Sequence, residues 1–368
     1  MNAQIDALKV LECFAGIGAC SKALENLGIE HEIVDAVEID KYAIMAFNAI
    51  HGTNFEPQDI SKWDKDIEVD LIMHGSPCQD FSIAGKGAGG DKDSGTRSSL
   101  MYETLRIIEK LEPKYVIWEN VKNLLSKKHR HNFDAYIQTM QNLGYNSYYQ
   151  VLNAKDFGVP QNRERVFTIS IRNDGEFDSY FVFPETVPLE KRLKDVLENE
   201  VDEKFYLSDE QIASFVKTTE KAKAKGNGFR FEPTNGAGYA KCIATRAGSR
   251  QTDNFVKIKT ANKQGYDLAT DGDGVDLAYP DSKTRRGRVG HGGSKTLPTS
   301  DSQGVMDGFR IRKLTPKECW RLMGFDDADF EKAEKVNSNT QLYKQAGNSI
   351  VVNVLEAILK ELLNGSAD

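Results

Sequence analysis

The sequence predicts an α/β protein with a doubly wound, mostly parallel sheet and a smaller, irregular β-rich domain inserted before the C-terminal helix. Three observations support this prediction. Residues 8–171 alternate short β-branched runs with helical patterns, which is typical of βαβ units. Residues 226–309 are instead rich in Gly, Thr, Asp and Asn, with few long apolar runs. Regular patterning returns at 314–323 and at 350–363, where we expect an amphipathic helix.

The strands and helices of the first part follow one another in regular order. Short apolar or β-branched runs predict strands at residues 8–14, 32–38, 69–73, 115–118, 147–152 and 165–171. Helical periodicity predicts helices at 19–27, 41–50, 98–111 and 132–143, and Gly28 and Gly144 end the first and last of them. Helices on both faces of such a sheet give a doubly wound domain.

Length and composition set the domain count and the environment. A chain of 368 residues is long for one core, so we expect one domain from residues 1–185 and 338–368 and a second from 186–337. No apolar run approaches the ~20 residues that span a membrane, and the N-terminus has no signal-peptide pattern. The five cysteines form no C-x-x-C pair and no cluster with His, which predicts no metal site, no disulfide framework and a reducing cytoplasm.

The charge distribution indicates where nucleic acid would bind. The net charge of −7 argues weakly against binding over the whole surface. Residues 241–300, however, carry eleven Lys or Arg against six Asp, and the segment 283–288 is strongly basic.

A cysteine stands at the end of one predicted strand. The apolar run at 69–73 is followed by the sequence GSPCQDFS at 75–82, and the chain from 85 to 95 is rich in glycine and charge. Open α/β sheets bind ligands at the carboxyl ends of their strands. Cys78 therefore fits a nucleophile beneath a loop that closes over it. A buried structural cysteine is the alternative for a lone Cys.

Glycines and carboxylates at the first strand ends predict a nucleoside site. The sequence FAGIG at 14–18 ends the first strand, and Glu38 ends the second, where a carboxylate holds ribose hydroxyls. Asp59 follows a third extended segment and is placed to accept the exocyclic amine of an adenine, with a solvated turn aspartate as the alternative. Ser21 replaces the third glycine of the dinucleotide fingerprint, which argues against NAD.

Charged groups also accompany two later strands. Glu119 follows the strand at 115–118, where apolar surroundings would raise its pKa and suit it to act as an acid; a surface glutamate is the alternative. Arg163 and Arg165 are two residues apart on an extended segment, so both project to one face. That pair suits phosphate or pyrimidine-carbonyl recognition, and exposed ion pairs are the alternative.

Taken together and in this order, these motifs resemble the DNA (cytosine-5) methyltransferases of the bacterial or phage type. The resemblance covers nearly all of residues 8–172 and 310–354 and rests on FAGIG, GSPCQ, ENV, QNRER, RKLTPKEC and QAGNS. Glu12 stands where the family often has Asp, and Ser76 where Phe or Pro is frequent. Neither departure touches an atom expected to react. The resemblance implies the Rossmann-like fold of S-adenosylmethionine-dependent methyltransferases.

The resemblance also implies a mechanism. The Cys78 thiolate would add to C6 of a cytosine flipped out of the duplex, and Glu119 would protonate or hydrogen-bond N3. Arg165 would hold the O2 carbonyl, and C5 would take the methyl group of S-adenosylmethionine, leaving S-adenosylhomocysteine. The implied catalytic residues are Cys78, Glu119, Arg163 and Arg165.

Further residues are carried over by motif, with no metal among the implied cofactors. Those implied to bind S-adenosylmethionine are Phe14, Gly16, Gly18, Glu38, Ile39, Asp59, Ile60, Ser76, Pro77, Asn348 and Ser349. Those expected to contact DNA are Gln79, Ser82, Lys283, Arg285, Arg286 and Arg288. The domain at 186–337 falls where the family places its target-recognition domain.

The sequence therefore predicts a monomer that methylates double-stranded DNA in a bacterial or phage-infected cell. It would belong to a restriction-modification or phage anti-restriction system, with a cognate endonuclease as a partner. A tRNA cytosine-5 methyltransferase is the nearest alternative, and methyl transfer to tRNA but not DNA would indicate it. A nicotinamide-dependent oxidoreductase would explain the glycines and Glu38 but not Cys78 or Glu119. A catalytically dead DNA-binding homologue is a third alternative, against which the intact reactive residues argue.

Overall fold

The computed structural model describes most of the chain in two compact units. The described residues are 7–77, 97–175, 180–224, 226, 230–234, 236–247, 249–256 and 311–364, with the backbone of three short strands between 274 and 305. The first unit comprises Met1–Lys191, Cys242–Thr245 and Cys319–Asp368, and the second comprises Arg192–Lys241 and Arg246–Glu318.

A six-stranded sheet in the order β2-β1-β3-β4-β7-β5 forms the centre of the first unit. Its strands are β1 (Leu8–Cys13), β2 (His31–Val37), β3 (Leu71–His74), β4 (Tyr115–Val121), β5 (Tyr145–Asn153) and β7 (Glu164–Arg172). The first four in this order run parallel, and β7 is antiparallel to both β4 and β5. The carboxyl ends of the parallel strands meet at one edge, where open α/β sheets bind ligands.

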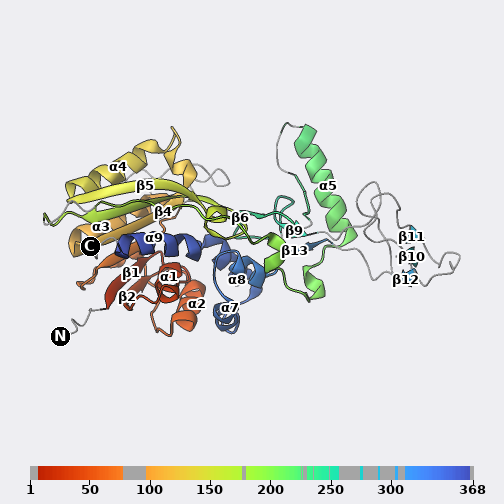
Figure 1. Ribbon diagram of the computed structural model, residues 1–368, viewed down its shortest axis with the longest axis horizontal. Coiled ribbons are helices and arrows are strands. Elements are labelled where there is room, and N and C mark those ends of the chain that lie inside the picture. The colour runs from red at the N-terminus through yellow and green to blue at the C-terminus, as the bar shows by residue number, and fades with distance from the viewer. Residues whose placement is uncertain are drawn as a thin grey trace. The chain divides into compact units, whose positions relative to one another are not determined.

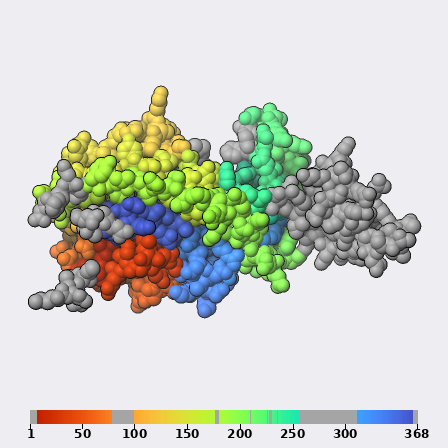
Figure 2. Space-filling model, in the orientation of Figure 1, coloured from red at the N-terminus to blue at the C-terminus, as the bar shows by residue number. Residues whose placement is uncertain are grey.

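Helices from both ends of the chain cover this sheet (Figure 1). The first unit contains α1 (Ala19–Asn26), α2 (Lys41–His51), α3 (Met101–Leu111), α4 (Arg130–Asn142), α7 (Asp327–Glu334), α8 (Asn339–Asn348) and α9 (Val352–Asn364), with the short strand β6 (Gln161–Asn162). α9 packs against α1, and α7 packs against α2. Figure 2 shows the C-terminal residues, in blue, directly against the N-terminal residues, in red. The last helices therefore bring their connecting turns to the sheet.

The main core lies between the sheet and the helices α3 and α4. Trp118 of β4 is 1% exposed and packs against Phe133 and Tyr136 of α4, at centroid distances of 5.8 and 4.0 Å. Burying each of these large rings contributes on the order of 2–3 kcal/mol. This packing fixes β4, and β4 carries Glu119.

The described part of the second unit has short strands and a long helix, α5 (Asp209–Ala224). Its strands are β8 (Ala240–Lys241), β9 (Phe255–Val256), β10 (Gly274–Asp276), β11 (Val289–Gly290), β12 (Gln303–Val305) and β13 (Arg312–Lys313), and α6 (Pro316–Arg321) follows them. Phe215, Phe231 and Phe255 form an aromatic cluster with centroids 5.2–5.6 Å apart. Arg312 donates to both carboxylate oxygens of buried Glu318 over 2.8 and 2.7 Å. This bidentate ion pair and the aromatic cluster hold irregular backbone together.

The structure confirms the predicted fold class. The predicted bounds of the sheet's strands, and of the four helices between them, lie within a few residues of the observed bounds. β4 continues to Val121, so Glu119 lies inside the strand and not after it. The compact units end at other residues than the predicted domains, because Cys319–Asp368 groups with the sheet. Buried Lys22 of α1 supplies a reason, since it pairs with Asp326 and Asp329 over 3.0 and 2.9 Å. The division of function between the predicted domains stays a prediction.

Candidate active site

The turn after β1 has a backbone that only a few residues tolerate. Phe14, Gly16 and Gly18 adopt φ angles of 55°, 58° and 80°. Such angles are easy for glycine and rare for a phenylalanine, so Phe14 marks a constrained position. The Gly16 N–H donates to Glu38 Oε2 over 3.1 Å, and the Ala15 N–H donates to the Val37 carbonyl over 3.3 Å. The end of β2 therefore holds the turn in place.

His51, which the sequence analysis did not single out, explains why Gly18 has no side chain. A Cβ atom on Gly18 would lie 2.1 Å from His51 Nε2 and 2.9 Å from the Phe47 ring. His51 Nε2 lies 3.2 Å from the Ile17 carbonyl, and burial lowers the pKa of the imidazole to about 4. The neutral ring therefore donates to this carbonyl and supports the turn from the side of α2. No sequence motif signals such a contact.

A buried carboxylate lies beneath the same turn. Glu12 is 3% exposed and accepts hydrogen bonds from Ser21 N over 3.0 Å and from Ser21 Oγ over 2.5 Å. Burial raises its pKa to about 7, against the opposing effect of these hydrogen bonds. Glu12 thus caps the first turn of α1 with its own carboxylate, at the place where dinucleotide-binding folds receive a pyrophosphate.

The predicted ribose and adenine residues follow β2. Burial raises the pKa of Glu38, and its carboxylate joins Gly16 N to Asp40 N, the latter over 2.8 Å. Ile39 exposes 70% of its surface, an apolar face suited to a flat base. Asp59 begins the short 3-10 helix Ile60–Lys62, and its Oδ1 accepts from Ser61 N and Oγ over 3.0 and 2.8 Å. Ile60 itself is buried.

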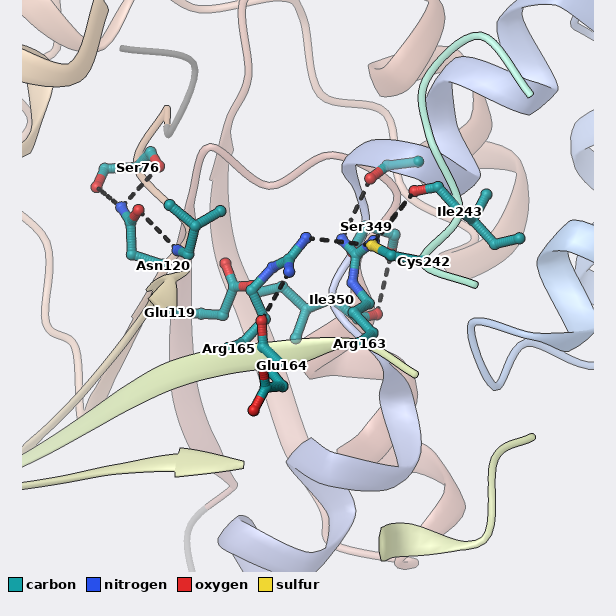
Figure 3. Close-up of polar contacts among 12 residues, drawn as sticks. Ser76, Glu119, Asn120, Arg163, Glu164, Arg165, Cys242, Ile243, Ser349 and Ile350 are labelled. Atoms are coloured by element: carbon teal, nitrogen blue, oxygen red, sulfur yellow. Dashed lines mark hydrogen bonds and ion pairs between the residues drawn. The ribbon is translucent and has the colours of Figure 1, made fainter. Parts of the chain in front are cut away.

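Ser76 precedes the cysteine motif and is held from β4. The Trp118 Nε1–H donates to Ser76 Oγ over 3.0 Å, and Asn120 Nδ2 donates to the Ser76 carbonyl and hydroxyl over 3.2 and 3.3 Å. Ser76 is 3% exposed, and its hydroxyl accepts hydrogen bonds from these side chains of β4; Figure 3 shows the contact with Asn120. These contacts fix the chain just before Pro77, which is half-buried.

Glu119 and Arg165 form an ion pair between β4 and β7. Arg165 Nε lies 2.9 Å from Glu119 Oε1, and the two side chains are 17% and 11% exposed. Burial raises the pKa of Glu119, although the charges of Arg165 and Arg163 act to lower it. Gly75 adjoins this carboxylate, since a Cβ there would lie in van der Waals contact with Glu119 Oε2, at 3.7 Å. The arrangement suits a carboxyl group that delivers a proton beside a fixed cation.

Arg163 has different partners from Arg165. Arg163 is 4% exposed, and its Nη2 donates to the carbonyls of Gly347 and Ser349 over 3.2 and 2.8 Å (Figure 3). Nη1 donates to the Ile243 carbonyl over 3.3 Å. These are contacts to main chain, which hold the C-terminal end of α8 beside the residue that precedes β7. A catalytic role for Arg163 stays a prediction.

Cys242 was also missed by sequence reasoning. Its Sγ lies 3.3 Å from Arg163 Nη1 and 3.9 Å from Arg165 Nη2. Cys242 is exposed, and partial desolvation of its sulfur acts to raise the pKa of the thiol, but the two guanidinium charges and their hydrogen bonds outweigh this and lower the pKa. Both arginines therefore reach one sulfur, in agreement with their predicted common face.

One pocket brings four of the predicted cofactor residues together with the predicted acid. It is lined by Glu12, Cys13, Phe14, Ala15, Gly16, Ala19, Cys20, Met73, Gly75, Glu119, Asn348, Ser349 and Ile350. Phe14, Gly16, Asn348 and Ser349 thus share a cavity with Glu119. The other predicted cofactor residues (Gly18, Glu38, Ile39, Asp59, Ile60, Ser76 and Pro77) do not line it. Cys78, Gln79, Ser82, Lys283, Arg285, Arg286 and Arg288 lie outside the described residues.

Comparison with known proteins identifies the family. A model described as C-5 cytosine-specific DNA methylase matches residues 8–364. The chain belongs to this family. It is a DNA C-5 cytosine methyltransferase, and the match favours DNA over the tRNA alternative.

Relatives match the methyltransferase over nearly its whole length. The orphan methyltransferase M.SPRI of Bacillus phage SPR is 34% identical over 97% of this chain and 98% of its own. The type II methyltransferase M2.ScrFI of Lactococcus lactis subsp. cremoris is 35% identical over 96% and 99%. The crystal structure of S. pombe Dnmt2 methyltransferase has the same fold, with a TM-score of 0.65 and 20% identity over 99% of this chain and 100% of that chain.

S-adenosylmethionine is the methyl donor that the family uses, and the chemistry of the pocket lining is compatible with it. The lining residues include the carboxyl groups of Glu12 and Glu119 and no Lys or Arg, so no side-chain cation of the lining opposes a bound sulfonium cation. Gly16 leaves its backbone open, because a Cβ there would meet nothing closer than the Phe14 carbonyl at 4.0 Å. Among the described residues, no cluster of side chains could hold a metal ion, and no helix could cross a membrane.

Proposed function

We propose that this methyltransferase methylates C5 of cytosine in double-stranded DNA by covalent catalysis from Cys78, the activity of a DNA (cytosine-5-)-methyltransferase (EC 2.1.1.37). The observation that supports this proposal is the shared pocket, in which the Glu119 carboxyl lies beside the turns of Phe14 and Asn348. An acid placed against a cofactor cavity is what methylation of a pyrimidine ring requires, because the ring must be activated before it accepts a methyl group.

The proposed mechanism gives separate roles to Cys78, Glu119 and Arg165. The Cys78 thiolate forms a bond to C6 of a flipped cytosine, and the electron pair displaced from the ring is stabilised at N3 and O2. Glu119 donates a proton or hydrogen bond to N3, which its raised pKa favours. Arg165 orients Glu119 over 2.9 Å and stabilises negative charge at O2. When bound, S-adenosylmethionine supplies the methyl group. A base then takes the C5 proton, and the electron pair of that C–H bond reforms the ring double bond and expels the Cys78 thiolate.

The cofactor would be held by turns at the carboxyl ends of β1, β2 and β3 and by the turn between α8 and α9. We assign its binding to Phe14, Gly16, Gly18, Glu38, Ile39, Asp59, Ile60, Ser76, Pro77, Asn348 and Ser349. Gly18 and Ser76 contribute through backbone, because His51 occupies the space beside Gly18 and β4 engages the Ser76 hydroxyl.

Target recognition is assigned to residues 186–337. The basic residues Lys283, Arg285, Arg286 and Arg288 would neutralise phosphates, and Gln79 and Ser82 would contact the flipped nucleotide. We further propose a monomer that acts in the cytoplasm of a bacterial or phage-infected cell. A cognate endonuclease is a proposed partner, since one relative is named a type II methyltransferase.

Substitution of the proposed nucleophile tests the mechanism. Cys78→Ala should abolish methyl transfer to plasmid DNA and leave DNA binding largely intact, whereas Cys319→Ala, which removes a buried thiol without a proposed role, should retain turnover. Bisulfite sequencing of plasmid from cells that express each variant would report activity and target site together. Substantial methylation by Cys78→Ala would overturn the covalent mechanism, and methylated tRNA with unmethylated DNA would overturn the substrate.

A further inference from the structure

The segment that carries the proposed adenine residues is irregular and needs support from elsewhere. Asp59 and Ile60 lie between β2 and β3, where the only regular structure described after α2 is the short 3-10 helix Ile60–Lys62. Asp59 Oδ1 is engaged by Ser61, so the carboxylate orientation depends on where this short helix lies. A hydrogen bond to an adenine amine tolerates errors of only a few tenths of an ångström.

Asp35 is the buried charge to which this segment is fastened. Its side chain is fully buried, in the middle of β2. Oδ1 accepts a hydrogen bond over 2.7 Å from Nε2 of Gln58, the residue directly before Asp59 in the sequence. Oδ2 accepts from Trp63 Nε1 and Lys65 Nζ, each over 2.7 Å. The donors therefore come from both sides of the Ile60–Lys62 turn and converge on one carboxylate.

A bulge in β2 accompanies this inward position of Asp35. Val10 of β1 pairs with Ile33, but the next residue, Leu11, pairs with Asp35, so Val34 is an extra residue in the strand. A bulge of this kind re-aims the side chain that follows it and is common beside functional sites. Without the extra residue, the alternation of the strand would place Asp35 on the other face.

A buried carboxylate is costly unless it is fully hydrogen-bonded, so Asp35 constrains its donors strongly. The Ala36 N–H adds a further hydrogen bond over 2.9 Å. Burial acts to raise the pKa of Asp35, yet Lys65, Trp63 and Gln58 outweigh it and lower the pKa. Arg106 of α3 also contacts this segment and donates to the Ile60 and Trp63 carbonyls over 3.1 and 2.8 Å.

We propose that Asp35 is a positioning residue for base selection: through Gln58 and Trp63 it sets the place of Asp59 and thereby makes the cofactor site prefer adenine to a base without an exocyclic amine. The inference rests on the proposed cofactor role of Asp59. Asp35 touches no ligand in this scheme, and its effect passes through the 58–63 segment alone.

A ratio of two affinities tests the inference. The probes are S-adenosylhomocysteine and its hypoxanthine analogue, S-inosylhomocysteine, with dissociation constants from calorimetry on the full chain. They share ribose and homocysteine, so a general loosening of the protein cancels in the ratio. The variants are Asp35→Asn and the milder Trp63→Phe, which keeps an aromatic ring but removes the Nε1 donor. Asp66→Asn, the same change at an exposed residue nearby, is the control.

The wild type should prefer the adenine probe by about tenfold or more, the value of one hydrogen bond to a charged group. Asp35→Asn and Trp63→Phe should each reduce this preference at least threefold, and Asp66→Asn should leave it unchanged. An unchanged preference in Trp63→Phe and in folded Asp35→Asn would overturn the inference, as would a wild type without preference. Adenine preference without any DNA methylation would instead contradict the proposed function and leave the inference standing.

Discussion

Arg165 Nε lies 2.9 Å from Glu119 Oε1, across the antiparallel pair of strands β7 and β4. Phe167 stands opposite Glu119 in the register and Arg165 stands opposite Val121, so the arginine side chain reaches back along the sheet to meet the carboxylate. Burial favours a protonated Glu119, and the guanidinium favours the charged form. A group balanced between these effects is suited to exchange a proton with a bound ring.

Replacement of Glu119 should slow the chemical step. Glu119→Gln keeps the shape of the side chain and removes the acidic proton, so single-turnover methylation with saturating DNA and cofactor should slow by about 10²-fold or more. Glu164→Gln makes the same change in an exposed residue paired with Lys122 and should have little effect. Single-turnover rates that are equal for the Glu119→Gln variant and the wild type would remove Glu119 from the role of acid.

The two arginines should separate in their effects. Arg163→Met leaves three main-chain carbonyls without their donor, so the free energy of unfolding should fall by about 3 kcal/mol or more. Arg165→Met removes the partner of Glu119 and should lower the rate of methyl transfer by about 10²-fold, with a smaller decrease in stability. Urea unfolding and single-turnover kinetics on both variants provide the comparison. Equal decreases in stability would contradict the distinction.

Glu12 should make stability depend on pH. Its pKa is raised from 4.5 to about 7 in the folded state, so its contribution to stability is present below pH 4.5 and is lost as pH rises through 7. Glu12→Gln removes this titration. The difference in unfolding free energy between variant and wild type should therefore shift in favour of the variant by about 2.5 kcal/mol from pH 5 to pH 8. The same difference at both pH values would refute the assignment.

The basic segment should control the salt dependence of DNA binding. Joint replacement of Lys283, Arg285, Arg286 and Arg288 by Gln should flatten the plot of log affinity against log salt, by about 0.9 for each phosphate that is no longer neutralised. Fluorescence anisotropy with a duplex at several salt concentrations measures the slope. A slope that stays the same would place the phosphate-binding residues elsewhere on the protein.

Particular residues mark where sequence reasoning succeeded and where it failed. Glu119 was predicted at a strand end with a raised pKa, and in the structure it lies buried within β4. This could be predicted because Glu119 directly follows the apolar run 115–118, and an apolar run indicates a buried strand. The common face of Arg163 and Arg165 followed from strand geometry. Their different partners did not, since these lie at 242–243, 347–349 and 119, far apart in the sequence.

The sequence by itself determined the alternating sheet and the family, and it predicted the residues whose chemistry suits methyl transfer, because side-chain chemistry and hydrophobic period are local properties. Only the tertiary structure decided what surrounds each of them. It engages Ser76 with Trp118, places His51 where Gly18 leaves room, and turns Asp35 inward at a bulge. Each of these contacts joins separate elements of the fold, and their geometry follows from the packing of the whole sheet, which no single motif encodes.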